Sequence, residues 1–192
     1  MLIAAVGALF WYNEYRYTLP TPVPQNYKAI NSGTTIKLLS GLQLDKNKPV
    51  LLHFFNPGCP CSRFNLAHVK SLIKQYNNKV SFAVVLVTSK DVSPEEIKQK
   101  YDLDVPVVNN RALAAACGVY STPQAVILTP QHQLVYRGNY NSSRYCTNKK
   151  TEYARQALDD VLQGIPVATT PLAAKAYGCS LADNQNTEKN VQ

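Results

Sequence analysis

The stretch PVLLHFFNPGCPCS, residues 49–62, decides the fold of this chain. Residues 49–55 are almost all apolar, which is typical of a central strand that is covered on both faces of a sheet. A turn then leads into Cys59-Pro60-Cys61-Ser62, and residues 62–76 carry apolar side chains at helical spacing. The stretch therefore predicts a buried strand, a turn with two cysteines, and a helix.

Cys59 is the predicted nucleophile, because it stands where that helix begins. The N–H groups and the positive dipole end of a helix stabilise a thiolate over a thiol, and the thiolate is the species that attacks disulfides. Cys61 is the predicted resolving thiol. The alternative is a single reactive thiol at Cys59, whose mixed disulfide an outside thiol resolves.

Strand and helix patterns continue to alternate outward from this stretch. The further segments are residues 80–87, 94–101, 105–108, 112–117, 124–128, 133–136 and 150–162. The early alternation requires parallel strands with right-handed crossovers, and the pair 124–128 and 133–136 adds an antiparallel hairpin. The prediction is an α/β fold with a mixed central sheet and helices on both faces. Residues 166–173 are expected to be extended.

The N-terminal residues differ in composition from the rest. Residues 1–12 are uncharged and apolar and end in aromatic residues, as segments at a membrane interface do, but a full span needs about 20 residues. We expect residues 1–17 to be the outer part of an uncleaved anchor that starts upstream; the alternative is a helix packed on the core. Residues 18–29 are expected to be a Pro-rich linker.

Residues 30–182 are then expected to be one globular domain, and residues 183–192 a polar, disordered tail. The chain of 192 residues has a net charge of +8, but no basic run exceeds two residues, so we expect no nucleic-acid partner. Its five cysteines fit an oxidising compartment. Together with the N-terminal segment they predict a membrane-anchored protein on the periplasmic or another extracytoplasmic side.

The segment order resembles that of the thioredoxin superfamily, in particular its redoxin and TlpA-like branch of membrane-tethered thiol–disulfide proteins. His53 to Pro60 resembles that branch's strand and active-site turn, and Gly118 to Pro123 resembles its cis-proline loop. The ending Tyr177 to Leu181 resembles a Gly-Cys ending of some redoxin-like proteins. The resemblance spans roughly residues 30 to 182.

This resemblance implies disulfide exchange with protein thiols and disulfides outside the cytoplasm, with no organic cofactor and no metal. It also implies a cis bond between Thr122 and Pro123, with the Thr122 backbone available to pair with an extended substrate. The motif departs from the usual Cys-x-x-Cys of the family. Either Ser62 takes the second cysteine position, or one deletion makes Cys61 the second cysteine.

The other three cysteines receive structural expectations. Cys146 and Cys179 flank the last predicted helix, and a disulfide between them would fasten the tail to the domain, with a stabilisation of roughly 3–4 kcal/mol. The alternative is a regulatory pair, or a resolving role for Cys179. Cys117, in an Ala-rich helix, is expected to be buried and inert.

Three other functions stay open as alternatives. Two thiolates one residue apart are soft ligands for Cu(I), which would suit copper binding or delivery. A thiol peroxidase is disfavoured by Asn56, since peroxiredoxin-type sites usually place a Thr or Ser three residues before the reactive cysteine. A thioredoxin-like scaffold that only binds partners in an envelope complex is the third alternative.

Overall fold

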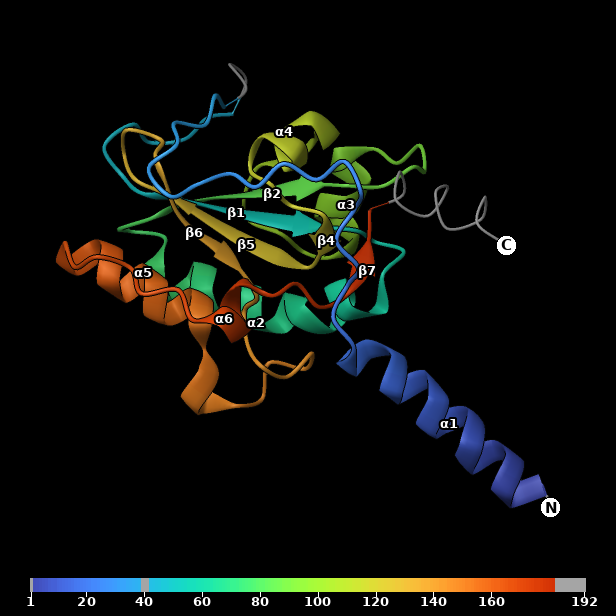
Figure 1. The fold of residues 1–192 in the computed structure, drawn as a ribbon. Helices are drawn as coiled ribbons and strands as arrows, with labels where there is room; N and C mark the ends of the chain where they lie inside the picture. Colours follow the sequence, from blue (N-terminus) through green and yellow to red (C-terminus); the bar gives the residue numbers. More distant parts are fainter. Residues whose placement is uncertain (1, 39–41, 182–192) are drawn as a thin grey trace.

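The computed structural model describes residues 2–38 and 42–181 of the chain (Figure 1). A five-stranded sheet has the order β3-β2-β1-β5-β6. Its strands are β1 (Val50–Phe55), β2 (Ser81–Leu86), β3 (Val107–Asn109), β5 (Gln124–Leu128) and β6 (Leu134–Gly138). A separate two-stranded sheet consists of β4 (Ser121–Thr122) and β7 (Cys179–Ser180).

The helices follow the predicted segments closely. They are α1 (Leu2–Thr18), α2 (Pro60–Tyr76), α3 (Pro94–Lys100), α4 (Arg111–Ala116), α5 (Tyr153–Gln163) and α6 (Pro171–Ala174), with a 3-10 turn η1 (Lys149–Thr151) before α5. The short α6 corrects the expectation that residues 166–173 are extended. Thr170 caps it by accepting a hydrogen bond from the Ala173 N–H at 3.2 Å, and Pro171 takes the first helical position.

Strand β1 lies at the centre of the sheet, and all six of its residues are buried. It runs parallel to β2, with Val50 opposite Ser81, and antiparallel to β5, with Val50 opposite Leu128. β6 continues the antiparallel side and β3 the parallel side. This is the mixed sheet that the sequence predicts.

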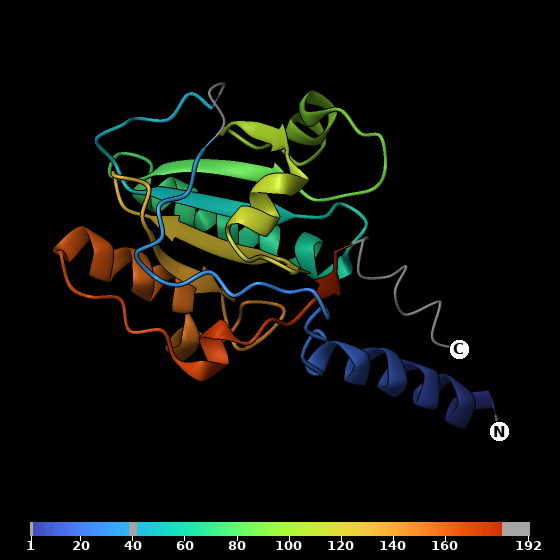
Figure 2. The same ribbon diagram turned by 45° about the horizontal axis from the view of Figure 1, so that its top comes forward.

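The two faces of the sheet carry separate apolar clusters. Successive side chains of a strand point to opposite faces, so Leu51 packs with the cluster that includes α2 and α5, whereas Leu52 packs with the cluster that includes α4. Figures 1 and 2 show α2 and α5 on one face of the sheet and α4 on the other. The helices on both faces fix the carboxyl end of β1, where α2 begins.

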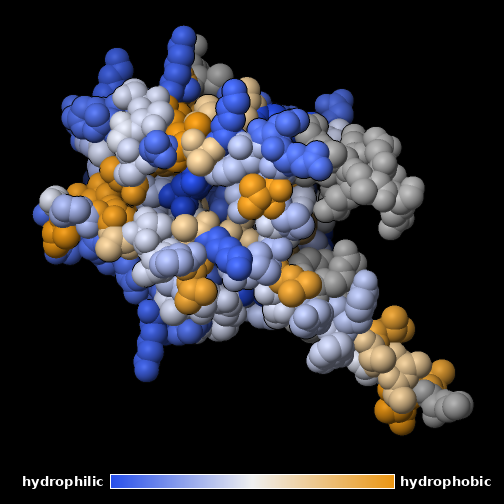
Figure 3. Space-filling view, in the orientation of Figure 1, coloured by the Kyte–Doolittle hydropathy of each residue, from blue (hydrophilic) through white to orange (hydrophobic). Residues whose placement is uncertain are grey.

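Helix α1 projects away from this domain and carries exposed apolar side chains (Figures 1 and 3). The exposed large ones are Leu2, Ile3, Val6, Leu9, Phe10, Trp11, Tyr12 and Tyr15. In the part of the chain that the structure describes, no helix is both long enough and apolar enough to cross a bilayer. The expected tail, residues 183–192, lies outside the described residues.

Candidate redox site

The turn after β1 places Cys59 at the amino end of α2. Cys59 is the N-cap, with an extended backbone (φ −87°, ψ 120°), and Pro60 takes the first helical position. Asn56 shapes the turn: its side-chain oxygen accepts from the Gly58 N–H at 2.9 Å, and its carbonyl accepts from the Cys59 N–H at 3.0 Å. The first turn of α2 holds no acidic residue, so nothing on the helix offsets its positive end.

Cys59 forms a disulfide with Cys179, 120 residues further along the chain, with 6.0 Å between the two Cα atoms. Cys59 is only 1% exposed, and Cys179 is half-buried. The expected disulfide between Cys146 and Cys179 is therefore wrong, because the Cys179 sulfur is already bonded to Cys59. Cys146 is a thiol.

Cys61 is not the disulfide partner of Cys59 in this structure. Each residue turns an α-helix by about 100°, so side chains two positions apart point in different directions. Cys61 is buried within the first turn of α2 and keeps its thiol. The nearest thiol in sequence is thus left out of the disulfide, while the most distant one forms it.

The loop before β5 completes the surroundings of the disulfide. The bond between Thr122 and Pro123 is cis, as the family resemblance implies. The Cys59 Sγ lies 3.5 Å from the Thr122 carbonyl oxygen. Strand β7 pairs antiparallel with β4, so that Cys179 stands opposite Thr122 and Ser180 opposite Ser121. The backbone edge that we expected to receive a substrate is occupied by the chain itself.

The segment expected to be a linker also contacts this site. The Thr21 N–H donates to the Ala176 carbonyl at 2.9 Å, and its hydroxyl lies 2.8 Å from the Ser121 hydroxyl. Pro20 forms an isolated antiparallel bridge with Tyr177. Residues 20–21 therefore hold the segment that leads into β7, although a Pro-rich linker was expected there.

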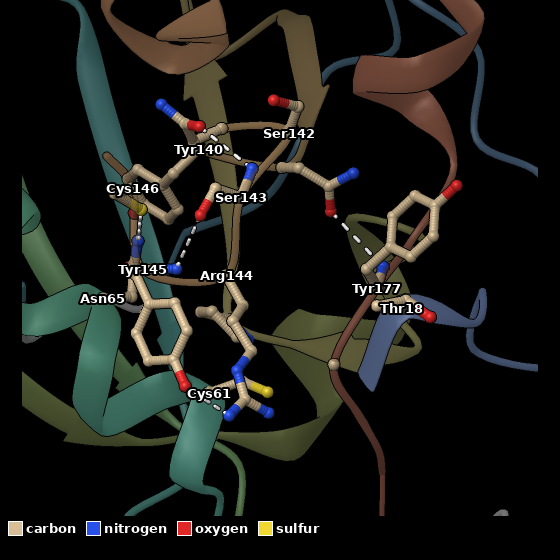
Figure 4. Close-up of a pocket in the computed structure, with 14 residues that line it drawn as sticks. Thr18, Cys61, Asn65, Tyr140, Ser142, Ser143, Arg144, Tyr145, Cys146 and Tyr177 are labelled. Atoms are coloured by element: carbon tan, nitrogen blue, oxygen red, sulfur yellow. Dashed lines mark hydrogen bonds between the residues drawn. The ribbon is translucent and has the colours of Figure 1, made fainter. Parts of the chain in front are cut away.

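A cavity of about 350 Å³ lies beside the disulfide (Figure 4). It is lined by Cys61 and Asn65 of α2, by Pro123, by the loop of residues 139–146, and by Thr18, Tyr177 and Gly178. Arg144 is the cationic residue among these, and none of the described residues that line the cavity is acidic. The cavity thus has a mixed, largely apolar lining with one cationic side chain, Arg144, next to the residue that precedes Cys179.

The two thiols outside α2, Cys117 and Cys146, are held in their protonated form. Burial raises the pKa of Cys117 to about 12. Burial also raises the pKa of Cys146 to about 11, although the Asn65 side-chain N–H donates to its sulfur at 2.9 Å and opposes that rise. Cys117 is fully buried, as predicted, and neither thiol has the environment of a nucleophile.

His53 lies on the α2 side of β1, where its Nδ1 is 2.9 Å from the Tyr140 hydroxyl. Burial lowers the pKa of His53 to about 3, so the ring is neutral near pH 7. Among residues 2–38 and 42–181, no group of three or more His, Cys, Asp or Glu side chains is arranged to hold a metal ion. The copper alternative therefore gains no ligand set from the described residues.

Comparisons with known proteins agree with this architecture. Residues 28–181 match a family described as Domain of unknown function (DUF6436). The chain is 31% identical over 136 residues to the thioredoxin-like protein YneN of Bacillus subtilis (strain 168), which covers 67% of this chain and 79% of that protein.

Solved structures show the same fold. An uncharacterized conserved protein from Geobacillus kaustophilus matches with a TM-score of 0.65 and 22% identity, over 85% of this chain and 97% of that one. A thioredoxin-like protein solved in its oxidized form matches with a TM-score of 0.51 and 15% identity, over 76% and 97%. The predicted thioredoxin-like α/β fold is confirmed.

Proposed function

We propose that this chain, which belongs to the thioredoxin-like proteins and to the family described as Domain of unknown function (DUF6436), is a thiol–disulfide oxidoreductase. Its redox couple is Cys59 with Cys179, and its substrates are protein thiols and disulfides. One observation carries the proposal: a disulfide joins the N-cap of α2 to a strand that lies against Thr122 and Pro123.

In the reduced protein, Cys59 is the nucleophile. Its thiolate attacks one sulfur of a substrate disulfide, a Cys59–substrate disulfide forms, and the other substrate sulfur leaves as a thiolate. The Cys179 thiolate then attacks the Cys59 Sγ, and the second substrate sulfur leaves. Two electrons have passed to the substrate, and the Cys59–Cys179 disulfide remains; the reverse sequence oxidises a substrate dithiol.

The surroundings of Cys59 suit this role. The 17-residue helix α2 directs its amino end at the sulfur, which favours the thiolate as attacking and as leaving group. Cys179 takes the resolving role that the sequence analysis gave to Cys61, because it is the cysteine whose sulfur reaches Cys59.

We also propose an extracytoplasmic location, with α1 as the element that associates with a membrane. The apolar side chains exposed along α1 support it, as does the disulfide, since disulfides persist mainly in oxidising compartments. Fractionation of cells that express the full chain, with and without residues 1–17, tests this. Recovery of both forms in the cytoplasmic fraction would contradict it.

The test of the redox proposal is a titration of the full chain in graded glutathione buffers, with alkylation and mass mapping of every cysteine. We expect Cys59 and Cys179 to change from disulfide to thiol together, at one potential, while Cys117 stays reduced throughout. The Cys146→Ser variant is the matched control, because Cys146 is a thiol near the same cavity and its loss should leave the midpoint unchanged.

Other outcomes would point elsewhere. A Cys59–Cys61 disulfide in the oxidised sample would restore the couple first expected from the sequence and overturn the assignment of Cys179. A Cys59 that stays reduced, or forms only a glutathione adduct, would overturn the two-cysteine mechanism altogether.

A further inference from the structure

Strand β7 occupies the edge of β4 in the way that a separate peptide would. It is two residues long, it comes from the C-terminal part of the chain, and its register sets Cys179 opposite Thr122. One further backbone hydrogen bond, from the Leu181 N–H to the Tyr120 carbonyl at 3.2 Å, extends the contact. The segment therefore presents a cysteine to Cys59 from an extended backbone.

Gly178, which precedes that cysteine, fits where no other residue does. A Cβ atom at this position would lie 2.2 Å from the Thr122 carbonyl oxygen, well inside contact distance. The backbone φ of Gly178 is +137°, a conformation that side-chain-bearing residues rarely adopt. Close pairing with Thr122 in this register thus requires glycine immediately before the cysteine.

We propose that β7 is a built-in stand-in for the substrate strand: reduction of the Cys59–Cys179 disulfide releases it from β4, and an extended partner segment with a Gly-Cys sequence takes its place. This inference rests on the proposed function and adds to it the kind of segment that a partner presents. It also makes the Cys59–Cys179 disulfide a latch, because the disulfide holds β7 on the edge of β4. The oxidised chain keeps its docking edge covered, and the reduced chain exposes it.

The contacts that remain after reduction are non-covalent. A strand of two residues offers a short hydrogen-bonded ladder, and short isolated ladders are marginal in water. The hydrogen bonds from Thr21 to Ala176 and Gly178 still hold the segment from its other side. The disulfide is thus the covalent part of the latch. Residues 20–21 keep the segment attached to the domain through their hydrogen bonds after the disulfide is reduced.

The cavity beside β7 adds a preference upstream of the Gly-Cys sequence. Tyr177 and Gly178 line it together with Arg144 and the polar loop of residues 139–146 (Figure 4). A partner strand in the same register would lay the residues before its cysteine along this wall. An acidic side chain suits the part of the wall that carries the Arg144 guanidinium, since no described residue that lines the cavity is acidic.

The test uses the full-length Cys179→Ser variant, in which the latch is open and Cys59 is retained. Its substrate is a peptide with the sequence of residues 175–181, KAYGCSL, whose cysteine carries a thionitrobenzoate group in a mixed disulfide. The Cys59 thiolate attacks the peptide sulfur, a Cys59–peptide disulfide forms, and thionitrobenzoate leaves and is measured by its absorbance. Mass mapping confirms that Cys59 holds the peptide.

We expect this peptide to react about tenfold faster than the same peptide with Ala in place of the Gly, since an Ala Cβ would lie 2.2 Å from the Thr122 carbonyl oxygen. Equal rates for the two peptides would overturn the inference. A small aromatic disulfide without a peptide is the control. If Cys59 fails to react with that reagent as well, the proposed function itself fails.

A second measurement follows the latch in the wild-type chain. Amide hydrogen exchange is compared between the oxidised protein and the protein reduced by a dithiol. The dithiol gives two electrons to the Cys59–Cys179 disulfide and becomes a disulfide itself. We expect faster exchange on reduction in residues 120–122 and 176–181, and unchanged exchange in β1 and β5. Exchange at β4 and β7 that does not respond to reduction would overturn the latch.

Discussion

Cys59 and Cys117 lie at opposite ends of two helices and are almost equally buried, yet we propose a reactive role for Cys59 alone. Cys59 is the N-cap of α2, and Cys117 is the C-cap of α4, with 1% and 0% exposure. Burial alone therefore does not separate a reactive cysteine from an inert one. The polarity of the helix end, and what lies against it, make the difference.

At Cys117 burial opposes a thiolate and outweighs the nearby Arg137 charge, which lowers the pKa of the thiol. The carboxyl end of a helix is its negative end, and the Cys117 N–H already donates to the Leu113 carbonyl at 3.0 Å. The thiol belongs to the apolar cluster on the α4 face of the sheet. At Cys59 the helix end is positive, and a strand that carries a second cysteine lies within bonding distance.

The largest effect should come from removing each cysteine in turn. We expect Cys59→Ala to lower the rate of insulin disulfide reduction by roughly 1,000-fold, because it removes the nucleophile. The matched variant Cys117→Ala should stay within about threefold of wild type, since that thiol takes no part. Comparable losses of rate in the two variants would show that the helix end at which a cysteine lies does not decide its reactivity.

The second test compares the ionisation of the two thiols. In the reduced Cys179→Ser variant, the alkylation rate of Cys59 should reach half its maximum at a lower pH than that of Cys117, whose pKa burial raises to about 12. Iodoacetamide labelling across a pH series, read by mass for each cysteine, measures this. If the two thiols label with the same pH dependence, the helix end does not control reactivity.

The third effect concerns stability. The Cys59–Cys179 disulfide spans 120 residues, and closing a loop of that size constrains the unfolded chain by about 4–5 kcal/mol. We expect reduction, or Cys179→Ser, to lower the free energy of unfolding in urea by about that amount. Cys117→Ser should respond to reduction as wild type does, because its thiol is outside the disulfide; a wild-type protein equally stable in both redox states would contradict this.

The smallest effect is expected at Cys61. Its position two residues after Cys59 suggests a partner, but Cys61 is buried, and Cys59 is bonded to Cys179. Cys61→Ser should leave the redox midpoint of the Cys59–Cys179 couple unchanged and alter the exchange rate by less than about threefold. A rate loss close to that of Cys59→Ala would return Cys61 to the mechanism.

The sequence was sufficient for the parts of the fold that rest on local pattern. The apolar run before Asn56 predicted β1, because a continuous apolar run is typical of a strand covered on both faces. Helical spacing after Ser62 predicted α2, because it places apolar side chains on one face of a helix. The cis bond before Pro123 followed from a family motif rather than from the physics of one residue. Thr170 and Pro171 carried a readable helix start, which was overlooked.

The pairing of Cys179 could not be read in the same way. A two-residue strand has no periodicity, and its place is set by hydrogen bonds from Thr21 and Thr122, which are distant from it in sequence. Proximity along the chain favoured Cys61 and Cys146 as partners. Cys61 is buried in the first turn of α2, and the Asn65 hydrogen bond holds Cys146 in another loop.

The bridge between Cys59 and Cys179 also has a mechanical consequence. A pulling force applied at the two ends of the oxidised chain passes from residue 59 to residue 179 through one covalent bond, so the 120 residues between them are shielded from extension. Only the segments outside the bridge can lengthen. After reduction the covalent bridge is absent, and the pulling force acts on β1, β2 and β5. The chain therefore resists extension between residues 59 and 179 when it is oxidised and can be extended there when it is reduced.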